Sequence, residues 1–410
     1  MSFSSLVLDK SLTDSVKALG YDSPTPIQQQ AIPAILAGKD IMAGAQTGTG
    51  KTAAFALPIL QQLIKYTDTS RPIRALVLTP TRELAQQVYK SFLSYAENTA
   101  LNVAVAYGGV SINPQIAALE KGADILIATP GRLLDHITKE SVNLSDLQTI
   151  VFDEADRMLD MGFKDEIDKI LDQLPNKRQT LLFSATFDDA IFKLSKTLLN
   201  NPLLIEVSER NAAAEQVEQL VYTVDNDRKR ELTSFLIGSR NWHQVLIFTR
   251  TKQMADDLAK EMCKDGINTQ SIHGDKSQGA RERVLAEFKQ GKTRALVATD
   301  VAARGIDIID LKYVINYELP YVAEDYIHRI GRTGRAGNTG LAISLMSPNE
   351  EWLLEAVEKV LDNTLLQRWL EGYEPDLTKQ NQQIKRGSKG KQKQQARKKA
   401  LGHKSPKKRG

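Results

Sequence analysis

The sequence has only one cysteine among its 410 residues, Cys263, so no disulfide can form within the chain. A reducing cytoplasm is the natural setting for such a protein. No apolar run is long enough to span a bilayer, and the first residues lack the basic-then-apolar order of a signal peptide. None of the five histidines has an H-E-x-x-H or C-x-x-C companion, which gives a structural metal site little support. We therefore expect a cytoplasmic protein without a membrane partner.

Acidic residues are missing from residues 378–410, which hold 13 of the 54 Lys and Arg residues. Residues 1–377 carry 41 basic and 50 acidic side chains, a net charge of −9. A mildly acidic body with a strongly basic end favours a polyanionic partner. Residues 373–410 have no apolar periodicity and are rich in Lys, Gln and Gly, so we expect them to be disordered. A merely solubilising tail is the alternative.

Short apolar segments alternate with helical ones along the rest of the chain, and 41% of all residues are hydrophobic. This alternation is typical of parallel sheets covered by helices on both faces. The expected strands are 40–43, 75–79, 124–129, 149–153, 180–184, 245–249, 269–273, 295–300, 313–317 and 341–345, and the expected helices include 53–64, 83–95, 254–264 and 280–289.

Two such series in succession predict an α/β protein with two tandem domains. We expect an N-terminal domain at 1–207, a linker at 208–217 and a C-terminal domain at 218–372, followed by the tail at 373–410.

Residues 44–52 fit the phosphate-binding pattern G-x-x-x-x-G-K-[ST], between an apolar segment and a helical one. Its glycines would let backbone N–H groups approach phosphates. Lys51 would contact the β- and γ-phosphates, and Thr52 would bind Mg²⁺. A Gly/Thr turn with an incidental lysine is the alternative.

The acidic pair Asp153 and Glu154 follows the apolar segment 149–152. The carboxyl end of a buried strand is where open α/β sheets build their sites. Asp153 would hold Mg²⁺ and Glu154 would orient the attacking water. A strand-ending acidic turn is the alternative.

Two further segments have open interpretations. Gln28 could pair with adenine through its amide, or it could belong to an exposed helix face, because it begins a run of three glutamines. Residues 328–335 read His-Arg-Ile-Gly-Arg-Thr-Gly-Arg, and their glycines disfavour a solvated helix face. Their arginines would reach a γ-phosphate as arginine fingers or would contact nucleic-acid phosphates directly.

Together these strings resemble the DEAD-box ATP-dependent RNA helicases of superfamily 2, over residues 1 to about 372. The chain also resembles their bacterial RhlE-type subgroup through its Ser-Phe-x-Ser-Leu start and Gly-Tyr-Glu-Pro-Asp exit. Other matching segments are 20–28, 45–52, 80–85, 108–109, 129–132, 153–156, 184–186, 247–250, 278–281, 298–307 and 328–335.

The resemblance implies two RecA-like domains that bind ATP and Mg²⁺ between them. The implied nucleotide contacts are Phe3, Gln28, Ala45, Gln46, Thr47, Gly48, Thr49, Gly50, Lys51, Thr52 and Asp307. The implied catalytic residues are Lys51, Asp153 and Glu154, with Arg332 and Arg335 as the arginine fingers. RNA backbone contacts would be Pro80, Thr81, Arg82, Gly109, Thr129, Arg132, Arg250, Arg281 and Thr299. The residues that would couple the two sites are Asp156, Ser184, Thr186 and His328.

The implied activity is an RNA-stimulated ATPase that unwinds short RNA duplexes and remodels RNA or RNA–protein complexes. An ATP-gated RNA clamp that serves as an assembly platform would need the same motifs, and a DNA translocase is disfavoured by Gln28 and the Asp-Glu-Ala-Asp signature. We expect a monomer. We also expect little RNA sequence specificity, because no folded RNA-binding domain follows residue 372. Candidate settings are ribosome biogenesis and RNA decay, with ribosome-assembly intermediates or the RNA-decay machinery as partners.

Overall fold

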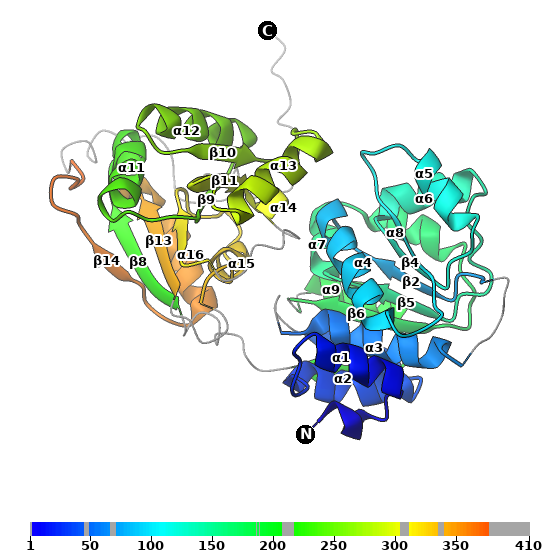
Figure 1. The fold of residues 1–410 in the computed structure, drawn as a ribbon. Coiled ribbons are helices and arrows are strands. Elements are labelled where there is room, and N and C mark those ends of the chain that lie inside the picture. Colours follow the sequence, from blue (N-terminus) through cyan, green and yellow to red (C-terminus); the bar gives the residue numbers. More distant parts are fainter. Residues whose placement is uncertain are drawn as a thin grey trace, which may run out of the picture. The chain divides into compact units, whose positions relative to one another are not determined.

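The structure is a computed structural model, and Figure 1 shows its two compact units, residues 1–209 (unit 1) and 210–410 (unit 2). Each unit is built on a 7-stranded parallel sheet. Among the helices described, none has both the length and the apolar character needed to cross a membrane. The structure describes residues 2–44, 49–65, 71–185, 187, 189–206, 217–303, 311–334 and 340–376.

The sheet of unit 1 has the strand order β3-β4-β2-β5-β6-β1-β7, with every pair parallel. Most of these strands are short and fully buried, as expected for a sheet covered on both faces. The strands are β1 (Ile41–Gly44), β2 (Ala75–Leu78), β3 (Val103–Ala106), β4 (Ile125–Ala128), β5 (Thr149–Phe152), β6 (Gln179–Ser184) and β7 (Leu203–Glu206).

Helices cover this sheet in two layers because alternate strand residues point to opposite faces. Val77 packs in the core with α1 to α4, whereas Leu76 and Leu78 pack in the core with α6 to α9. The helical elements are η1 (Phe3–Leu6), α1 (Lys10–Ala18), α2 (Pro26–Leu36), α3 (Lys51–Leu63), α4 (Arg82–Ala96), α5 (Asn113–Leu119), α6 (Pro130–Thr138), α7 (Ala155–Asp160), α8 (Lys164–Leu171) and α9 (Asp189–Leu198).

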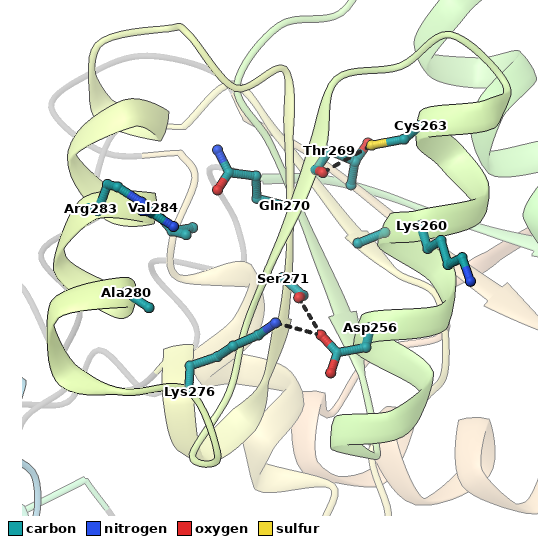
Figure 2. A pocket seen from close by; sticks show the side chains of 11 residues that line it. Asp256, Lys260, Cys263, Thr269, Gln270, Ser271, Lys276, Ala280, Arg283 and Val284 are labelled. Carbon is teal, nitrogen blue, oxygen red and sulfur yellow. Dashed lines mark hydrogen bonds and ion pairs between the residues drawn. The ribbon is translucent and has the colours of Figure 1, made fainter.

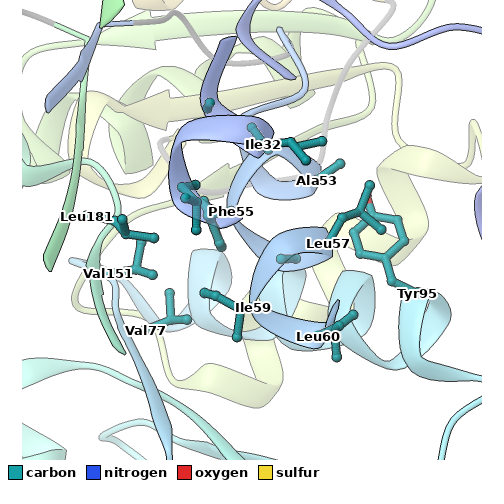
Figure 3. Close-up of a cluster of buried hydrophobic side chains, with 14 of the residues drawn as sticks. Ile32, Ala53, Phe55, Leu57, Ile59, Leu60, Val77, Tyr95, Val151 and Leu181 are labelled. Atoms are coloured by element: carbon teal, nitrogen blue, oxygen red, sulfur yellow. The ribbon is translucent and has the colours of Figure 1, made fainter. Parts of the chain in front are cut away.

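The helix that follows the phosphate-binding loop, α3, is anchored in the first of these cores (Figure 3). Its Phe55 lies 5.2 Å from Phe183 of β6 and 6.1 Å from Phe92 of α4, measured between ring centroids. Such aromatic pairs stabilise a core beyond the area they bury. The amino end of α3 is therefore fixed relative to the sheet.

The sheet of unit 2 has the order β10-β11-β9-β12-β13-β8-β14, which repeats the order of unit 1 strand for strand. Its strands are also all parallel. The strands are β8 (Val217–Thr223), β9 (Val245–Thr249), β10 (Thr269–Ile272), β11 (Ala295–Thr299), β12 (Tyr313–Asn316), β13 (Gly340–Met346) and β14 (Leu366–Arg368). The helical elements are η2 (Asn226–Arg228), α11 (Lys229–Ser239), α12 (Lys252–Lys264), α13 (Gln278–Lys289), α14 (Asp300–Ala303), α15 (Glu324–Ile330), η3 (Pro348–Glu350) and α16 (Glu351–Leu361).

All ten expected strands and all four expected helices are present, with ends shifted by no more than two residues. The strands β3, β7, β8 and β14 were not expected; three of them, β3, β7 and β14, lie at sheet edges and show little of the buried apolar pattern. The domain boundary at residue 207 stays a prediction, because 207–216 lies outside the described residues.

The expected start of the disordered tail at residue 373 is wrong. Tyr373 packs against Phe235 with ring centroids 5.5 Å apart, and the guanidinium of Arg228 lies 4.7 Å from its ring centroid. The backbone N–H of Asp376 also donates to Asp225. Residues 373–376 therefore belong to unit 2, while the basic residues 377–410 lie outside the described part of the chain.

Candidate functional site

The predicted phosphate-binding loop leaves β1 at Gly44 and enters α3 at Lys51. Gly50 has φ 88°, and a Cβ at this position would overlap the amide of Gln28. Glycine is therefore required there by both backbone conformation and space. The predicted contacts Ala45, Gln46, Thr47 and Gly48 lie outside the described residues.

Two buried charged groups lie at the start of α3 and the end of β5. Lys51 is only 7% exposed, and within the described residues its Nζ has no hydrogen-bond partner. Asp153 is also buried, and its Oδ1 likewise lacks a partner there. Burial raises the pKa of Asp153 to about 6, the positive charge of Lys51 opposes the rise, and Glu154 adds to it.

A buried ammonium and carboxylate with unused hydrogen-bonding capacity fit a phosphate and a divalent cation. A cation beside Asp153 would stabilise its ionised form, and a phosphate would compensate Lys51. Thr52, the next residue of α3, is half-buried. The residues present therefore suit Mg-ATP.

Glu154 occupies an unusual backbone position between β5 and α7. Its φ of 56° places it in the left-handed region, where residues other than glycine are uncommon. The side chain is buried, and its Oε2 lies 3.4 Å from Nε of Arg157. This conformation and the ion pair hold Glu154 directly after Asp153 at the carboxyl end of β5, which is consistent with the predicted role in orienting water.

Gln28 is not on an exposed helix face, since it is only 3% exposed. Its Oε1 accepts from the backbone N–H of Thr25 at 3.0 Å, and its Nε2 donates to the carbonyl of Gly50 at 3.1 Å. The amide therefore joins α2 to the phosphate-binding loop. Phe3 is buried in the same core as α2 and α3. Adenine contacts by both residues stay predictions.

The predicted coupling residues are partly brought together. Asp156 of α7 accepts from the backbone N–H of Ala185 at 3.2 Å, so it contacts the segment that follows Ser184 of β6. Ser184 is fully buried. This contact joins the segments that follow β5, which leads into Asp153, and β6, which lies between β5 and β1 in the sheet. Thr186 lies outside the described residues.

The predicted RNA contacts of unit 1 follow the carboxyl ends of β2, β3 and β4. Pro80 and Thr81 come after β2, and Oγ1 of Thr81 caps α4 by accepting from Leu84 N–H. Thr129 begins α6 after β4. Gly109 follows β3 with φ 80°, and a Cβ there would overlap the guanidinium of Arg82. These residues therefore form one neighbouring set.

The edge of the unit 1 sheet thus divides into two halves. Along the order β3-β4-β2-β5-β6-β1, the first three strands lead into the predicted RNA contacts, β5 and β1 lead into the predicted nucleotide residues, and β6 between them ends at the predicted coupling residue Ser184. Parallel strands make this possible because all their carboxyl ends meet at one edge. The contact between Asp156 and Ala185 lies within the nucleotide half.

In unit 2 the predicted RNA contacts likewise lie along the strands β10, β11 and β9. Arg250 follows β9, Arg281 lies on the helix after β10, and Thr299 ends β11. His328 and Arg332 come from α15 and the turn that follows it, after β12. Arg335 and Asp307 lie outside the described residues.

Arg250 is held by several groups of unit 2. Its Nε donates to the carbonyl of Leu319 at 2.7 Å, its Nη1 donates to the hydroxyl of Tyr321 at 3.3 Å, and its Nη2 pairs with Glu350. Glu350 also pairs with Lys229, which is fully buried, at 2.7 Å. An RNA contact by Arg250 would therefore start from a fixed guanidinium.

The segment before α13 is anchored by Asp256 of α12 (Figure 2). Its carboxylate accepts from Ser271 at 2.5 Å and from Lys276 at 2.9 Å, and it lies 3.0 Å from Nε2 of His273. Burial alone would raise the pKa of Asp256, but these donors hold it well below its usual range. A groove of about 320 Å³ lies beside this cluster, between α12, β10 and α13. Asp256 thereby fixes the turn that leads to Arg281.

The expectation for residues 328–335 needs a correction. His328 and Arg329 belong to α15, so the segment leaves the helix only at Gly331. Arg329, for which the sequence left open an arginine finger or a nucleic-acid contact, is 1% exposed and binds both carboxylate oxygens of Asp300 at 2.6 and 2.8 Å. His328 lies 3.9 Å from Asp325, and Arg332 is buried. The first arginine of the motif is therefore structural.

A second residue that sequence reasoning missed is Gln115 of α5, which is 9% exposed and bonded to three other residues. A glutamine six residues beyond Gly109 gives no signal by itself in a single sequence. Only the structure shows that its amide lies between the predicted RNA-binding segments.

Comparison with known proteins identifies the class and then the family. The family profile described as DEAD/DEAH box helicase matches residues 25–194, and the profile described as Helicase conserved C-terminal domain matches residues 227–337. The chain is thus a helicase of two α/β domains. It belongs to the DEAD-box family of ATP-dependent RNA helicases, because its similarity to members of that family extends over most of both chains.

The DEAD-box ATP-dependent RNA helicase RhpA of Helicobacter pylori is 42% identical over 364 residues, which cover 89% of this chain and 73% of RhpA. The ATP-dependent RNA helicase CshA of Listeria monocytogenes is 43% identical over 357 residues, which cover 87% of this chain and 68% of CshA. The solved structure of S. cerevisiae Dbp5 bound to RNA and ADP BeF3 is 30% identical, with a TM-score of 0.82, over 98% of this chain and 99% of Dbp5.

These similarities confirm the expected fold, two tandem RecA-like domains, and the expected enzyme class, an ATP-dependent RNA helicase with RNA-stimulated ATPase activity. The RhlE-type subgroup stays a prediction.

Proposed function

We propose that the chain separates short RNA duplexes, and remodels RNA or RNA–protein complexes, by gripping one strand while ATP is bound and releasing it after hydrolysis. The proposal rests chiefly on the edge of the unit 1 sheet, where the strands that lead into the predicted RNA contacts adjoin those that lead into the predicted nucleotide residues. Dbp5 has been solved with both RNA and an ATP-like ligand, which supports simultaneous binding in this fold.

In the nucleotide half, Lys51 would hold the β- and γ-phosphates, and Thr52 and Asp153 would hold Mg²⁺, which supplies charge neutralisation at the phosphates. Glu154 would orient the attacking water as general base. Arg332 and Arg335 would stabilise the charge that develops on the γ-phosphate. Asp307 would contact the ribose.

In the RNA half, contacts to phosphates and sugars would hold one strand without reading its bases. The matched residues are Pro80, Thr81, Arg82, Gly109, Thr129 and Arg132 in unit 1, with Arg250, Arg281 and Thr299 in unit 2. Asp156, Ser184, Thr186 and His328 would transmit the state of the nucleotide to this half. We further infer a cytoplasmic monomer that acts in ribosome biogenesis or RNA decay.

The decisive experiment measures ATP hydrolysis with RNA, with DNA of the same sequence and without polymer. We expect stimulation by RNA alone, because 2′-hydroxyl contacts distinguish the two polymers. Equal stimulation by DNA would contradict an RNA-directed activity. Strand separation of a short duplex in the same reactions distinguishes an unwinding enzyme from an ATP-gated clamp, which would hold RNA without separating strands.

Glu154→Gln provides the matched variant for this assay. We expect it to bind ATP and RNA but to lose roughly 10²- to 10⁴-fold in hydrolysis, because the amide cannot act as general base. A variant that turned over ATP at the parental rate would remove Glu154 from the proposed mechanism.

A further inference from the structure

The turn at Gly108 and Gly109 is fixed at both of its ends by side chains. The carbonyl of Tyr107, just before the turn, accepts from Nε2 of Gln115 at 3.0 Å. The carbonyl of Val110, just after it, accepts from Nη2 of Arg132 at 2.8 Å. Two adjacent glycines have more backbone freedom than any other pair of residues, so these bonds determine the conformation of the turn.

The amide of Gln115 also connects this turn to α6. Its Oε1 lies 3.0 Å from Nη1 of Arg132 and 3.2 Å from Nε2 of His136. A guanidinium can only donate, so the amide atom that faces it must be the oxygen, and the NH₂ group must face the carbonyl of Tyr107. The side chains of Gln115, Arg132 and His136 are all buried.

The same reasoning defines the state of His136. Its Nε2 must donate to Gln115, while its Nδ1 lies 2.8 Å from the hydroxyl of Ser141. Burial, with the nearby charge of Arg132, lowers the pKa of His136, which is consistent with a neutral ring. The network therefore has one arrangement of donors and acceptors, with Gln115 at its centre.

We propose that Gln115 is a positioning residue for RNA binding, which holds the Gly108–Gly109 turn at a fixed distance from the amino end of α6. This inference rests on the proposed function, since Gly109, Thr129 and Arg132 are the RNA contacts it would align. All three guanidinium nitrogens of Arg132 are bonded within the protein, to Gln115, Val110 and Asp135. Arg132 thus supports the same turn, and a direct phosphate contact would need one of these bonds to open.

The Gly108–Gly109 turn is distant from the phosphate-binding loop in the sheet. The turn follows β3 at one edge, and β4, β2, β5 and β6 separate β3 from β1, which leads into the phosphate-binding loop. Loss of the Gln115 amide should therefore weaken RNA binding without changing ATP binding. It should raise the RNA concentration needed for half-maximal ATPase stimulation and leave the rate at saturating RNA unchanged.

Two variants of the full chain test the role. Gln115→Leu removes both amide groups, and Gln115→Glu keeps an acceptor for Arg132 but replaces the donor to Tyr107 with a second acceptor. We expect each to raise the half-maximal RNA concentration roughly tenfold, the equivalent of one buried hydrogen bond of about 1.4 kcal/mol. The KM for ATP and the basal ATPase should match the parent. Gln115→Glu decides the question if Gln115→Leu does not fold.

Gln62→Leu is the matched control. Gln62 lies on α3 and donates to the backbone carbonyl of Ile35 at 3.0 Å, so its loss also removes a side-chain bond to backbone. It should lower the melting temperature but leave the RNA dependence unchanged. If the Gln115 variants melt earlier but need no more RNA than the parent, Gln115 is only structural and the inference is wrong. Absence of RNA stimulation in the parent itself would instead refute the proposed function.

Discussion

The buried carboxylate of Asp153 should destabilise the nucleotide-free protein at neutral pH, and Asp153→Asn should relieve that cost. Desolvation raises the pKa of Asp153 from 3.8 to about 6 in the folded state. One pKa unit corresponds to about 1.36 kcal/mol, so ionising this group costs folding about 3 kcal/mol once the pH is above both values.

The stability difference between Asp153→Asn and the parent should depend on pH because the pKa of Asp153 is raised in the folded state. Below about pH 4 the carboxyl is protonated in the folded and unfolded states, and its full contribution to stability is present. As the pH rises through about 6, the folded state must hold a buried charge and that contribution is lost. Asparagine is neutral at every pH, so the variant should exceed the parent by up to about 3 kcal/mol at pH 7.5 and by little at pH 4.

Urea unfolding of the full chain without nucleotide, at pH 7.5 and pH 4, measures this difference. All three tryptophans, Trp242, Trp352 and Trp369, lie in unit 2. Their fluorescence therefore follows unit 2 as an internal reference, while far-ultraviolet circular dichroism follows both units. Asp14→Asn, at an exposed position of α1, controls for the change of net charge. The reasoning would be refuted if Asp153→Asn were no more stable than the parent at pH 7.5, or if its stability advantage were as large at pH 4 as at pH 7.5.

Three other changes have defined outcomes. Arg332→Ala should lower the RNA-saturated ATPase rate by roughly 10³-fold and leave nucleotide-free RNA binding nearly unchanged; equal losses in both assays would favour a direct RNA contact instead. Gly109→Ala should raise the half-maximal RNA concentration in ATPase titrations roughly tenfold, because a left-handed alanine costs about 1–2 kcal/mol and its Cβ displaces Arg82. Gly108→Ala, which has room for a Cβ, should change it little, and equal effects of the two would contradict this explanation. Deleting residues 378–410 should weaken RNA binding at low salt, with the basal ATPase intact. The deletion should also flatten the plot of log K against log salt by roughly 0.7 for each RNA phosphate that the tail neutralises in the parent. An unchanged slope would support the solubilising tail.

The positions of Lys51 and Asp153 at strand ends could be predicted from the sequence because each lies close to an apolar segment in the chain, while their roles stay predictions. A loop between an apolar segment and a helix, and an acidic pair after another apolar segment, define where Lys51 and Asp153 lie once the sheet is parallel. The central strands were predicted for the same reason, since continuous apolar runs indicate burial on both faces.

The groups that sequence could not assign act across the fold. Gln115 of α5 donates to the backbone carbonyl of Tyr107, which follows β3, and accepts from the side chain of Arg132 of α6. Arg329 appears in a motif of arginines that look alike in the sequence, yet burial separates its role from that of its neighbours. The roles of these arginines depend on whether each side chain points into the core or out of it. The hydrophobic periodicity of a helix as short as α15 does not predict this direction.

The single cysteine gives the enzyme one native site for labelling with a thiol-reactive dye. Cys263 is exposed near the end of α12, and its Sγ contacts only the carbonyl of Thr269 at 3.2 Å among the bonds described for it. A thiol-reactive dye would therefore mark unit 2 at one position and leave unit 1 unlabelled. With a second cysteine placed at the exposed Lys39 of unit 1, energy transfer between two dyes would follow the separation of the units as ATP and RNA are added. Any change in that separation during the proposed cycle could then be timed in single molecules without removing a native residue of the site.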